Sequence, residues 1–189
     1  MSRWSLTLIL ALTLACGGCD RQAADSAQGE PALAGGKTFL PGQIDRASAG
    51  ALMPAVAVRD PQGRELNLAA LQGQPVLLNL WATWCAPCVV EMPMLDELAQ
   101  EMDGTLRVVT VSQDLAGADK VVPFFATGSF VRLEPWLDPN SELGFRVESD
   151  VLPTTILYDA SGLEVWRVVG EYDWSSAAAR EAIAEASAE

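Results

Sequence analysis

The sequence predicts an α/β domain built on a central mixed β-sheet flanked by helices, and three observations lead to that class. A continuous apolar run over residues 76–82 is typical of a strand buried on both faces, and helical spacing follows it to about residue 102. A second buried strand, residues 106–111, is also followed by a helix, residues 118–126. A hairpin and an alanine-rich helix close the chain. Such an order favours helices packed on a mixed sheet.

The remaining elements are expected to be short. Residues 56–58 and 65–66 flank a turn and predict an N-terminal β-hairpin extension, after which Asn67 caps one helical turn through Leu71. The later elements are a strand at residues 136–137, a helix over residues 141–145 closed near Gly144, a hairpin of residues 154–158 and 164–169, and a terminal helix over residues 174–186.

The long helix, residues 87–102, is expected to bury one side against the sheet. Its apolar spacing predicts an inner stripe of Val90, Met94, Leu95 and Leu98. Pro93 predicts a kink, because proline removes one hydrogen bond from the helix interior.

The first 53 residues predict export and a tether. Residues 1–15 place Arg3 before an apolar run that is too short to span a membrane, which is the pattern of a secretory signal. Residues 16–53 are rich in Ala, Gly, Gln, Ser and Asp, and they predict a flexible linker. Residues 54–189 are left for the folded domain.

A cysteine at the end of the signal raises the question of lipidation. Cys16 follows small residues and resembles the acylated cysteine of bacterial lipoproteins, and Cys19 is the second candidate. Cleavage near Ala15 without a lipid is the alternative. The expected location is periplasmic, tethered to the inner membrane through the lipid or released as a soluble form.

The net charge of −13 argues against nucleic acid as a partner and weakly favours basic clients. The sequence contains no recognisable nucleotide-binding loop or site for an organic cofactor. Four cysteines in two Cys-x-x-Cys pairs suggest zinc, but the pairs are far apart, the first lies at a processing site, and the chain has no histidine. We therefore expect no metal and no cofactor.

The second cysteine pair, Cys85-Ala86-Pro87-Cys88, lies where the central strand gives way to the long helix. The first turn of a helix presents unpaired N–H groups and a partial positive charge, which favour a thiolate. We expect Cys85 to be the N-cap, with a pKa below the free value of about 8.5. By itself the spacing also fits an inert disulfide or half of a zinc site, but Trp84 and Pro87 favour disulfide exchange.

These residues resemble a known family. Trp84-Cys85-Ala86-Pro87-Cys88, with Asn79-Leu80-Trp81-Ala82-Thr83 before it and Glu91-Met92-Pro93 after it, is similar to the thioredoxin superfamily and its TlpA-like branch. The resemblance extends from about Pro54 to the C-terminus and implies a thioredoxin-like fold with a redox-active Cys85–Cys88 disulfide.

The resemblance also implies roles for individual residues. Leu152 and Pro153 would form a cis-proline loop that faces the cysteines and binds substrate together with Trp84, Ala86 and Pro87. Helical spacing, and not the resemblance, makes Glu91 the candidate proton acceptor for Cys88, because it lies three residues further along the same face. A solvated helix charge is the equal alternative. Thioredoxin carries an aspartate where this chain has Asn79. Trp81 is expected in the core and Trp84 as a lid over the sulfurs, whereas Gln113 and Asp114 are given no chemical role beyond capping the next helix.

The implied function is reduction of client proteins with reducible cysteine pairs, as in cytochrome c or copper-site maturation, with electrons from a DsbD-type membrane thiol donor. An oxidant or isomerase is the first alternative. A non-catalytic redox-sensing or interaction lipoprotein with a structural disulfide is the second.

Overall fold

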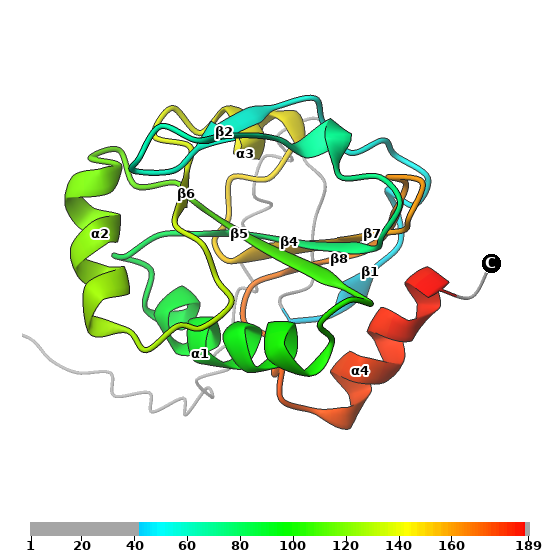
Figure 1. The fold of residues 1–189 in the computed structure, drawn as a ribbon. Helices are drawn as coiled ribbons and strands as arrows, with labels where there is room; N and C mark the ends of the chain where they lie inside the picture. Colours follow the sequence, from blue (N-terminus) through cyan, green and yellow to red (C-terminus); the bar gives the residue numbers. More distant parts are fainter. Residues whose placement is uncertain (1–41, 188–189) are drawn as a thin grey trace, which may run out of the picture. The chain divides into compact units, whose positions relative to one another are not determined.

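The structure is a computed structural model that describes residues 42–187, so the predicted signal peptide, Cys16 and Cys19 lie outside the described residues. The chain forms one sheet with helices on both faces (Figure 1). In chain order the elements are β1 (Ile44–Asp45), β2 (Ala57–Arg59), β3 (Glu65–Asn67), η1 (Leu68–Ala70), β4 (Val76–Trp81), α1 (Ala86–Glu101), β5 (Arg107–Ser112), α2 (Ala118–Thr127), β6 (Trp136–Leu137), α3 (Glu142–Arg146), β7 (Thr154–Tyr158), β8 (Glu164–Val169), α4 (Ala177–Ala184) and η2 (Glu185–Ser187).

The sheet has the strand order β1-β8-β7-β4-β5-β6-β2-β3. Strand β4 runs parallel to β5 and antiparallel to β7, so the predicted mixed sheet is confirmed. The predicted N-terminal hairpin is β2–β3, and it joins the sheet through a pairing between β2 and β6. Figure 1 shows α1 and α4 on one face of the central strands and α3 on the other.

Strand β4 is buried along its whole length because both faces of the sheet are covered. Leu77 and Trp81 pack into the cluster beneath α1 and α4, whereas Leu78 and Leu80 pack into the cluster on the opposite face. Burial on both faces explains the continuous apolar run in the sequence. The strand thereby fixes the position at which the chain enters α1.

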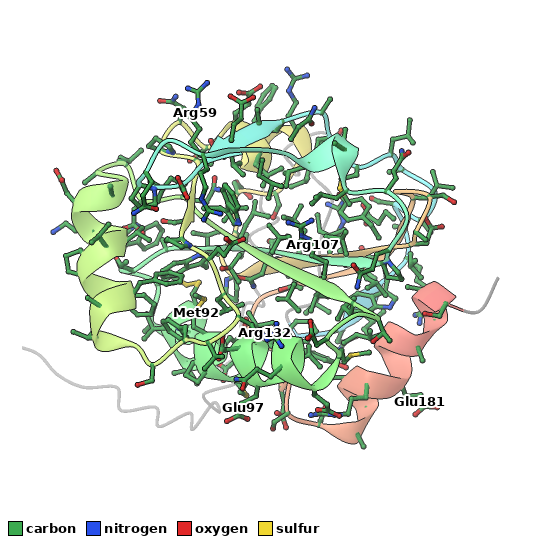
Figure 2. The ribbon with its side chains drawn as sticks, viewed as in Figure 1. Arg59, Met92, Glu97, Arg107, Arg132 and Glu181 are labelled. Atoms are coloured by element: carbon green, nitrogen blue, oxygen red, sulfur yellow. A yellow bond between two sulfur atoms is a disulfide. The ribbon has the colours of Figure 1, made fainter. Side chains whose placement is uncertain are left out.

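Helix α1 buries a different stripe from the predicted one. Leu95 and Leu98 are fully buried as expected, but Val90 is 59% exposed, and Met92 is fully buried. The phase is set by Cys88, which faces the sheet, so the residues three or four positions apart follow it into the core. Figure 2 shows Met92 between α1 and the sheet, with Glu97 on the outer side of the helix.

Two element ends differ from the prediction. Gly144 lies inside α3 and is buried rather than closing it, and a Cβ at this position would come within 3.1 Å of the Ser149 carbonyl oxygen. Helix α4 begins after Ser176, whose side chain accepts a hydrogen bond from the Ala179 N–H. Trp174 precedes the helix and stacks on Trp166 in the core, so its apolar side chain reflects packing in the core rather than a place in the helix.

The predicted linker is folded in the part that the structure describes. Ile44 and Asp45 pair with Val168 and Arg167 of β8, and Leu52 forms a bridge with Leu163. The folded unit therefore begins before residue 54. The segment was missed because its contribution is mainly backbone pairing, which leaves no apolar period in the sequence.

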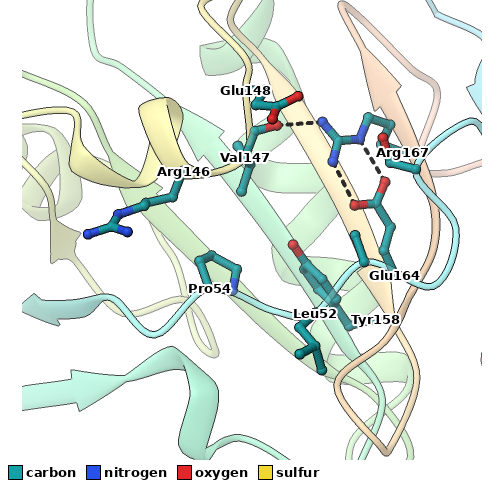
Figure 3. A pocket seen from close by; sticks show the side chains of 10 residues that line it. Leu52, Pro54, Arg146, Val147, Glu148, Tyr158, Glu164 and Arg167 are labelled. Carbon is teal, nitrogen blue, oxygen red and sulfur yellow. Dashed lines mark hydrogen bonds and ion pairs between the residues drawn. The ribbon is translucent and has the colours of Figure 1, made fainter.

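A buried ion pair lies on β8. Arg167 donates to both carboxylate oxygens of Glu164, at 2.7 and 2.6 Å, and to the Val147 carbonyl oxygen at 2.7 Å (Figure 3). Both side chains are almost fully buried. They border a pocket of about 100 Å³ that is also lined by Tyr158 and Leu52, and neither Cys85 nor Cys88 lines it. The Arg167 guanidinium is satisfied by protein groups, so the pair is structural.

Arg167→Leu is expected to lower the free energy of unfolding by about 3–5 kcal/mol, because it leaves the Glu164 carboxylate buried and unpaired. The double variant Glu164→Leu/Arg167→Leu should recover most of that loss. Urea unfolding of the three proteins measures both effects. If the free energy of unfolding of Arg167→Leu lies within about 1 kcal/mol of the wild-type value, the ion pair is not desolvated as described.

Candidate active site

The two cysteines at the start of α1 form a disulfide with an S–S distance of 2.03 Å. Cys85 is the N-cap, as predicted, and its sulfur accepts a hydrogen bond from the Cys88 N–H at 3.3 Å. The exposed fraction is 6% for Cys85 and 1% for Cys88. An incoming sulfur can therefore approach Cys85 more readily than Cys88, and the N–H groups of the first turn favour a thiolate there after reduction.

The Leu152–Pro153 peptide bond is cis, as the family resemblance implies. Pro153 is buried and Leu152 half-buried, and the Pro153 carbonyl oxygen accepts a hydrogen bond from the Gly170 N–H at 2.8 Å. Thr154, the next residue, pairs with Leu80 of β4. The sheet register thus places this loop at the end of β4 from which the chain continues to Cys85.

Glu91 lies one turn beyond Cys88 and is 1% exposed. Its Oε1 accepts a hydrogen bond from the Tyr172 N–H at 2.7 Å. Burial, and to a smaller extent the charge of Glu171, raises the pKa of Glu91 to about 7, against the opposing effects of the Tyr172 N–H and the Trp174 side chain. The alternative of a solvated helix charge is therefore wrong, and the carboxyl group can exchange a proton near neutral pH.

Asn79 occupies the position of the thioredoxin aspartate and is buried on β4. Its Nδ2 donates to Thr155 Oγ1 at 2.9 Å, and its Oδ1 has no partner. The amide cannot act as a proton acceptor in the way a carboxylate can.

The two tryptophans beside the cysteines lie in different environments. Trp81 is in the core, as predicted, with its ring 4.9 Å from that of Phe124. Trp84 is 70% exposed, and its role as a lid over the sulfurs stays a prediction. Ala86 is also exposed and Pro87 is half-buried.

Asp114 has a role that the sequence did not indicate. Its carboxylate accepts hydrogen bonds from the backbone and side chain of Thr83, two residues before Cys85. It does not cap α2 with its side chain, because the N-cap of that helix is Gly117. No local sequence signal identifies a contact across 31 residues. Gln113 is buried with neither side-chain polar atom hydrogen-bonded, and we assign it no role.

Residues 42–187 contain neither a metal-binding cluster of side chains nor a helix suited to spanning a membrane. Within that part of the chain no group of three or more His, Cys, Asp or Glu side chains could hold a metal ion. No helix there is both long and apolar enough to cross a membrane.

Comparison with known proteins agrees with this geometry. Residues 49–163 match the AhpC/TSA family. The thiol-disulfide oxidoreductase ResA of Bacillus thuringiensis is 30% identical over 118 residues, which are 62% of this chain and 68% of that protein. The thiol:disulfide interchange protein DsbE of Pseudomonas aeruginosa is 32% identical over 136 residues, 70% of this chain and 73% of that protein.

A solved structure from Chlorobium tepidum, of a protein proposed to be a thiol:disulfide interchange protein DsbE, superposes with a TM-score of 0.64 at 25% identity. The match covers 73% of this chain and 96% of that one. The predicted thioredoxin-like fold and the TlpA-like resemblance are confirmed by these matches. The chain therefore belongs to the AhpC/TSA family, and within it to the thioredoxin-like thiol-disulfide oxidoreductases of the ResA and DsbE type.

Proposed function

We propose that this enzyme reduces disulfides in exported client proteins through Cys85 and Cys88. The observation that carries the proposal is the position of the pair at the start of α1, with Cys85 the more accessible sulfur and Cys88 buried behind it. This arrangement separates the attacking thiol from the resolving thiol.

The reaction proceeds by two exchanges. The Cys85 thiolate attacks one sulfur of the client disulfide, that S–S bond breaks, and the released client thiolate takes up a proton. The Cys88 thiolate then attacks the Cys85 sulfur, which frees the second client sulfur as a thiolate that is also protonated. The client gains two electrons and two protons, and the enzyme is left with the Cys85–Cys88 disulfide.

Glu91 is the proposed proton acceptor for Cys88. A buried thiol has a raised pKa, so its deprotonation needs an acceptor nearby. Glu91 is on the same helix face one turn away, and it is buried. A pKa of about 7 lets it take a proton at neutral pH and return it later.

The proposed substrate surface consists of Trp84, Ala86, Pro87, Leu152 and Pro153. Trp84, Ala86 and Pro87 lie within two positions of Cys85 in the sequence. Leu152 and Pro153 form the cis-proline loop at the same end of the sheet. The exposed indole of Trp84 offers an apolar contact for a client segment that flanks its disulfide.

The proposed setting is the periplasm, with an N-terminal signal peptide over residues 1–15, a flexible tether after it, and a lipid on Cys16. Exported compartments are oxidising, so a reductant there needs electrons from a membrane thiol donor of the DsbD type. Support comes from the signal-like sequence and from the similarity to ResA and DsbE. Cytochrome c and copper-site proteins are the proposed clients.

The reduction potential tests the direction of the reaction. We expect equilibration of the Cys85–Cys88 pair with glutathione at pH 7 to give a value below about −200 mV, as a reductant requires. Mass spectrometry after acid quenching and alkylation gives the fraction of dithiol. A value above about −150 mV would overturn the proposal and favour an oxidant or isomerase.

A further inference from the structure

Asp114 lies at the end of β5 and is 2% exposed. Its Oδ2 accepts hydrogen bonds from the Thr83 N–H at 2.9 Å and the Ser112 hydroxyl at 2.8 Å, and its Oδ1 accepts one from the Thr83 hydroxyl at 2.7 Å. Three donors therefore converge on two oxygens. An ionised carboxylate accepts hydrogen bonds only, so this donor set fits the charged form.

The contacts of this carboxylate connect β5 to the turn that leads into the active site. Thr83 lies between the end of β4 and Cys85, and the Cys85 N–H closes the turn by donating to the Ala82 carbonyl oxygen at 3.1 Å. The next helix does not use the Asp114 side chain, since its N-cap is Gly117. The turn before Cys85 is therefore held by a buried negative charge.

We propose that Asp114 is a positioning residue that holds the turn before Cys85. Its fixed negative charge disfavours the Cys85 thiolate and thereby biases the Cys85–Cys88 dithiol/disulfide couple toward the disulfide. The first turn of α1 has the opposite effect, because its N–H groups favour the thiolate. A nearby like charge disfavours the ionised form of a thiol. The nucleophilicity of Cys85 is thus set by a balance between the helix terminus and Asp114.

This balance bears on the direction of electron transfer, and in that respect the inference rests on the proposed function. Any group that destabilises the reduced, ionised pair makes the enzyme a stronger electron donor. Asp114 would therefore help a Cys-x-x-Cys site at a helix N-terminus to act as a reductant.

The charge effect has a characteristic pH dependence. It acts only on the thiolate, so it vanishes below the pKa of Cys85 and is complete well above it. Other charged or titratable side chains on the elements that meet at this end of the sheet are common to the proteins compared below. They are Cys88 and Glu91 on α1, Asp119 and Lys120 in the first turn of α2, Asp138 after β6, Asp150 before β7, and Glu171 after β8, whose charge acts on Glu91.

The test compares wild type with Asp114→Asn, which has nearly the same volume, removes the charge and keeps one of the two acceptor oxygens. Alkylation of reduced protein at a series of pH values gives the pKa of Cys85, which we expect to fall by about half a unit to one unit in the variant. The equilibrium constant with glutathione should move toward the dithiol about three- to tenfold at pH 8.5, which is about 15–30 mV. At pH 5.5 the two proteins should differ by less than about 1.5-fold.

Asp159→Asn is the matched control. Asp159 is also a buried aspartate that accepts backbone hydrogen bonds, from Ser161 and Leu163 at 2.8 and 2.9 Å. It follows Tyr158, which pairs with Val76 at the opposite end of β4 from the cysteines. This variant should lose stability without a change in the Cys85 pKa or in the glutathione equilibrium.

An unchanged or higher Cys85 pKa in Asp114→Asn would overturn the inference, as would a shift of the equilibrium that is equal at both pH values. If Asp114→Asn does not fold, Ser112→Ala serves instead, because it removes one donor and leaves the charge less compensated. It should raise the Cys85 pKa by a few tenths of a unit, and a fall would contradict the inference. These are differences between proteins, so they are independent of the absolute potential that tests the proposed function.

Discussion

Cys85→Ser is expected to abolish insulin reduction, with a loss of at least about 10³-fold, because no other sulfur in the site is accessible to a client disulfide. Cys88→Ser should also fail to turn over, but for a different reason. Its Cys85 thiolate can still attack, and the mixed disulfide then persists because the resolving sulfur is missing. Non-reducing electrophoresis should therefore find a covalent adduct with Cys88→Ser and none with Cys85→Ser.

Both variants are best made in a background that lacks Cys16 and Cys19, so that only the active-site pair can react. The double variant Cys85→Ser/Cys88→Ser is the control for non-specific adducts. Equal reduction rates for wild type and Cys85→Ser would remove the catalytic role and favour a non-catalytic lipoprotein with a structural disulfide. Adducts on Cys88 in the Cys85→Ser variant would reverse the assignment of the attacking and resolving sulfurs.

Glu91→Gln is expected to slow disulfide reduction at pH 7 by about ten- to a hundredfold, because it removes the acceptor for the Cys88 proton. The loss should fall on the release of reduced client rather than on the first attack. Rapid-quench trapping with the variant should accordingly show that the mixed disulfide accumulates. The matched control is Glu97→Gln, an exposed position on the outer side of the same helix (Figure 2).

The same variant should be more stable than wild type at alkaline pH. The pKa of Glu91 is raised from 4.5 to about 7 in the folded protein, so between these values the folded state binds more protons than the unfolded state. The free energy of unfolding of the wild type therefore falls as the pH rises through this window, by about 3 kcal/mol. Glu91→Gln removes that loss, so it should be more stable by about 2–3 kcal/mol at pH 8 and nearly unchanged at pH 4.5.

Urea unfolding of wild type, Glu91→Gln and Glu97→Gln at the two pH values separates these effects. A Glu91→Gln variant that is equally stable relative to wild type at both pH values would contradict the raised pKa. If Glu91→Gln shows the expected gain in stability but reduces disulfides at the wild-type rate, the raised pKa of Glu91 is supported and its role in proton transfer is contradicted.

The central strands and the cysteine site could be predicted because their signals are local. The apolar run of β4 is continuous as a result of burial on both faces, and Cys85 caps α1 with Pro87 in the first turn, where proline is favoured. The hairpin of β7 and β8 has the predicted bounds for the same reason, since β-branched and aromatic residues flank a turn marked by Gly162.

The features that the sequence did not reveal depend on contacts between distant segments. Asp114 reaches Thr83 across 31 residues, and β1 pairs with β8 from the opposite end of the chain. The burial of Glu91 arises partly from the segment around Tyr172, so its carboxyl group looks like an ordinary helix charge in the sequence. The phase of α1 was wrong at Val90 because Cys88, and not the apolar residues alone, sets which side faces the sheet.

The most direct test of the account is the pH dependence of alkylation of the reduced wild-type protein, followed by peptide mass mapping. We expect Cys85 to react first, with an apparent pKa below about 8.5, while Cys88 stays protected until the protein unfolds. A Cys85 thiol that resists alkylation at pH 7 to 8 in the folded protein, or a Cys88 thiol that reacts before it, would contradict the assignment of Cys85 as the nucleophile.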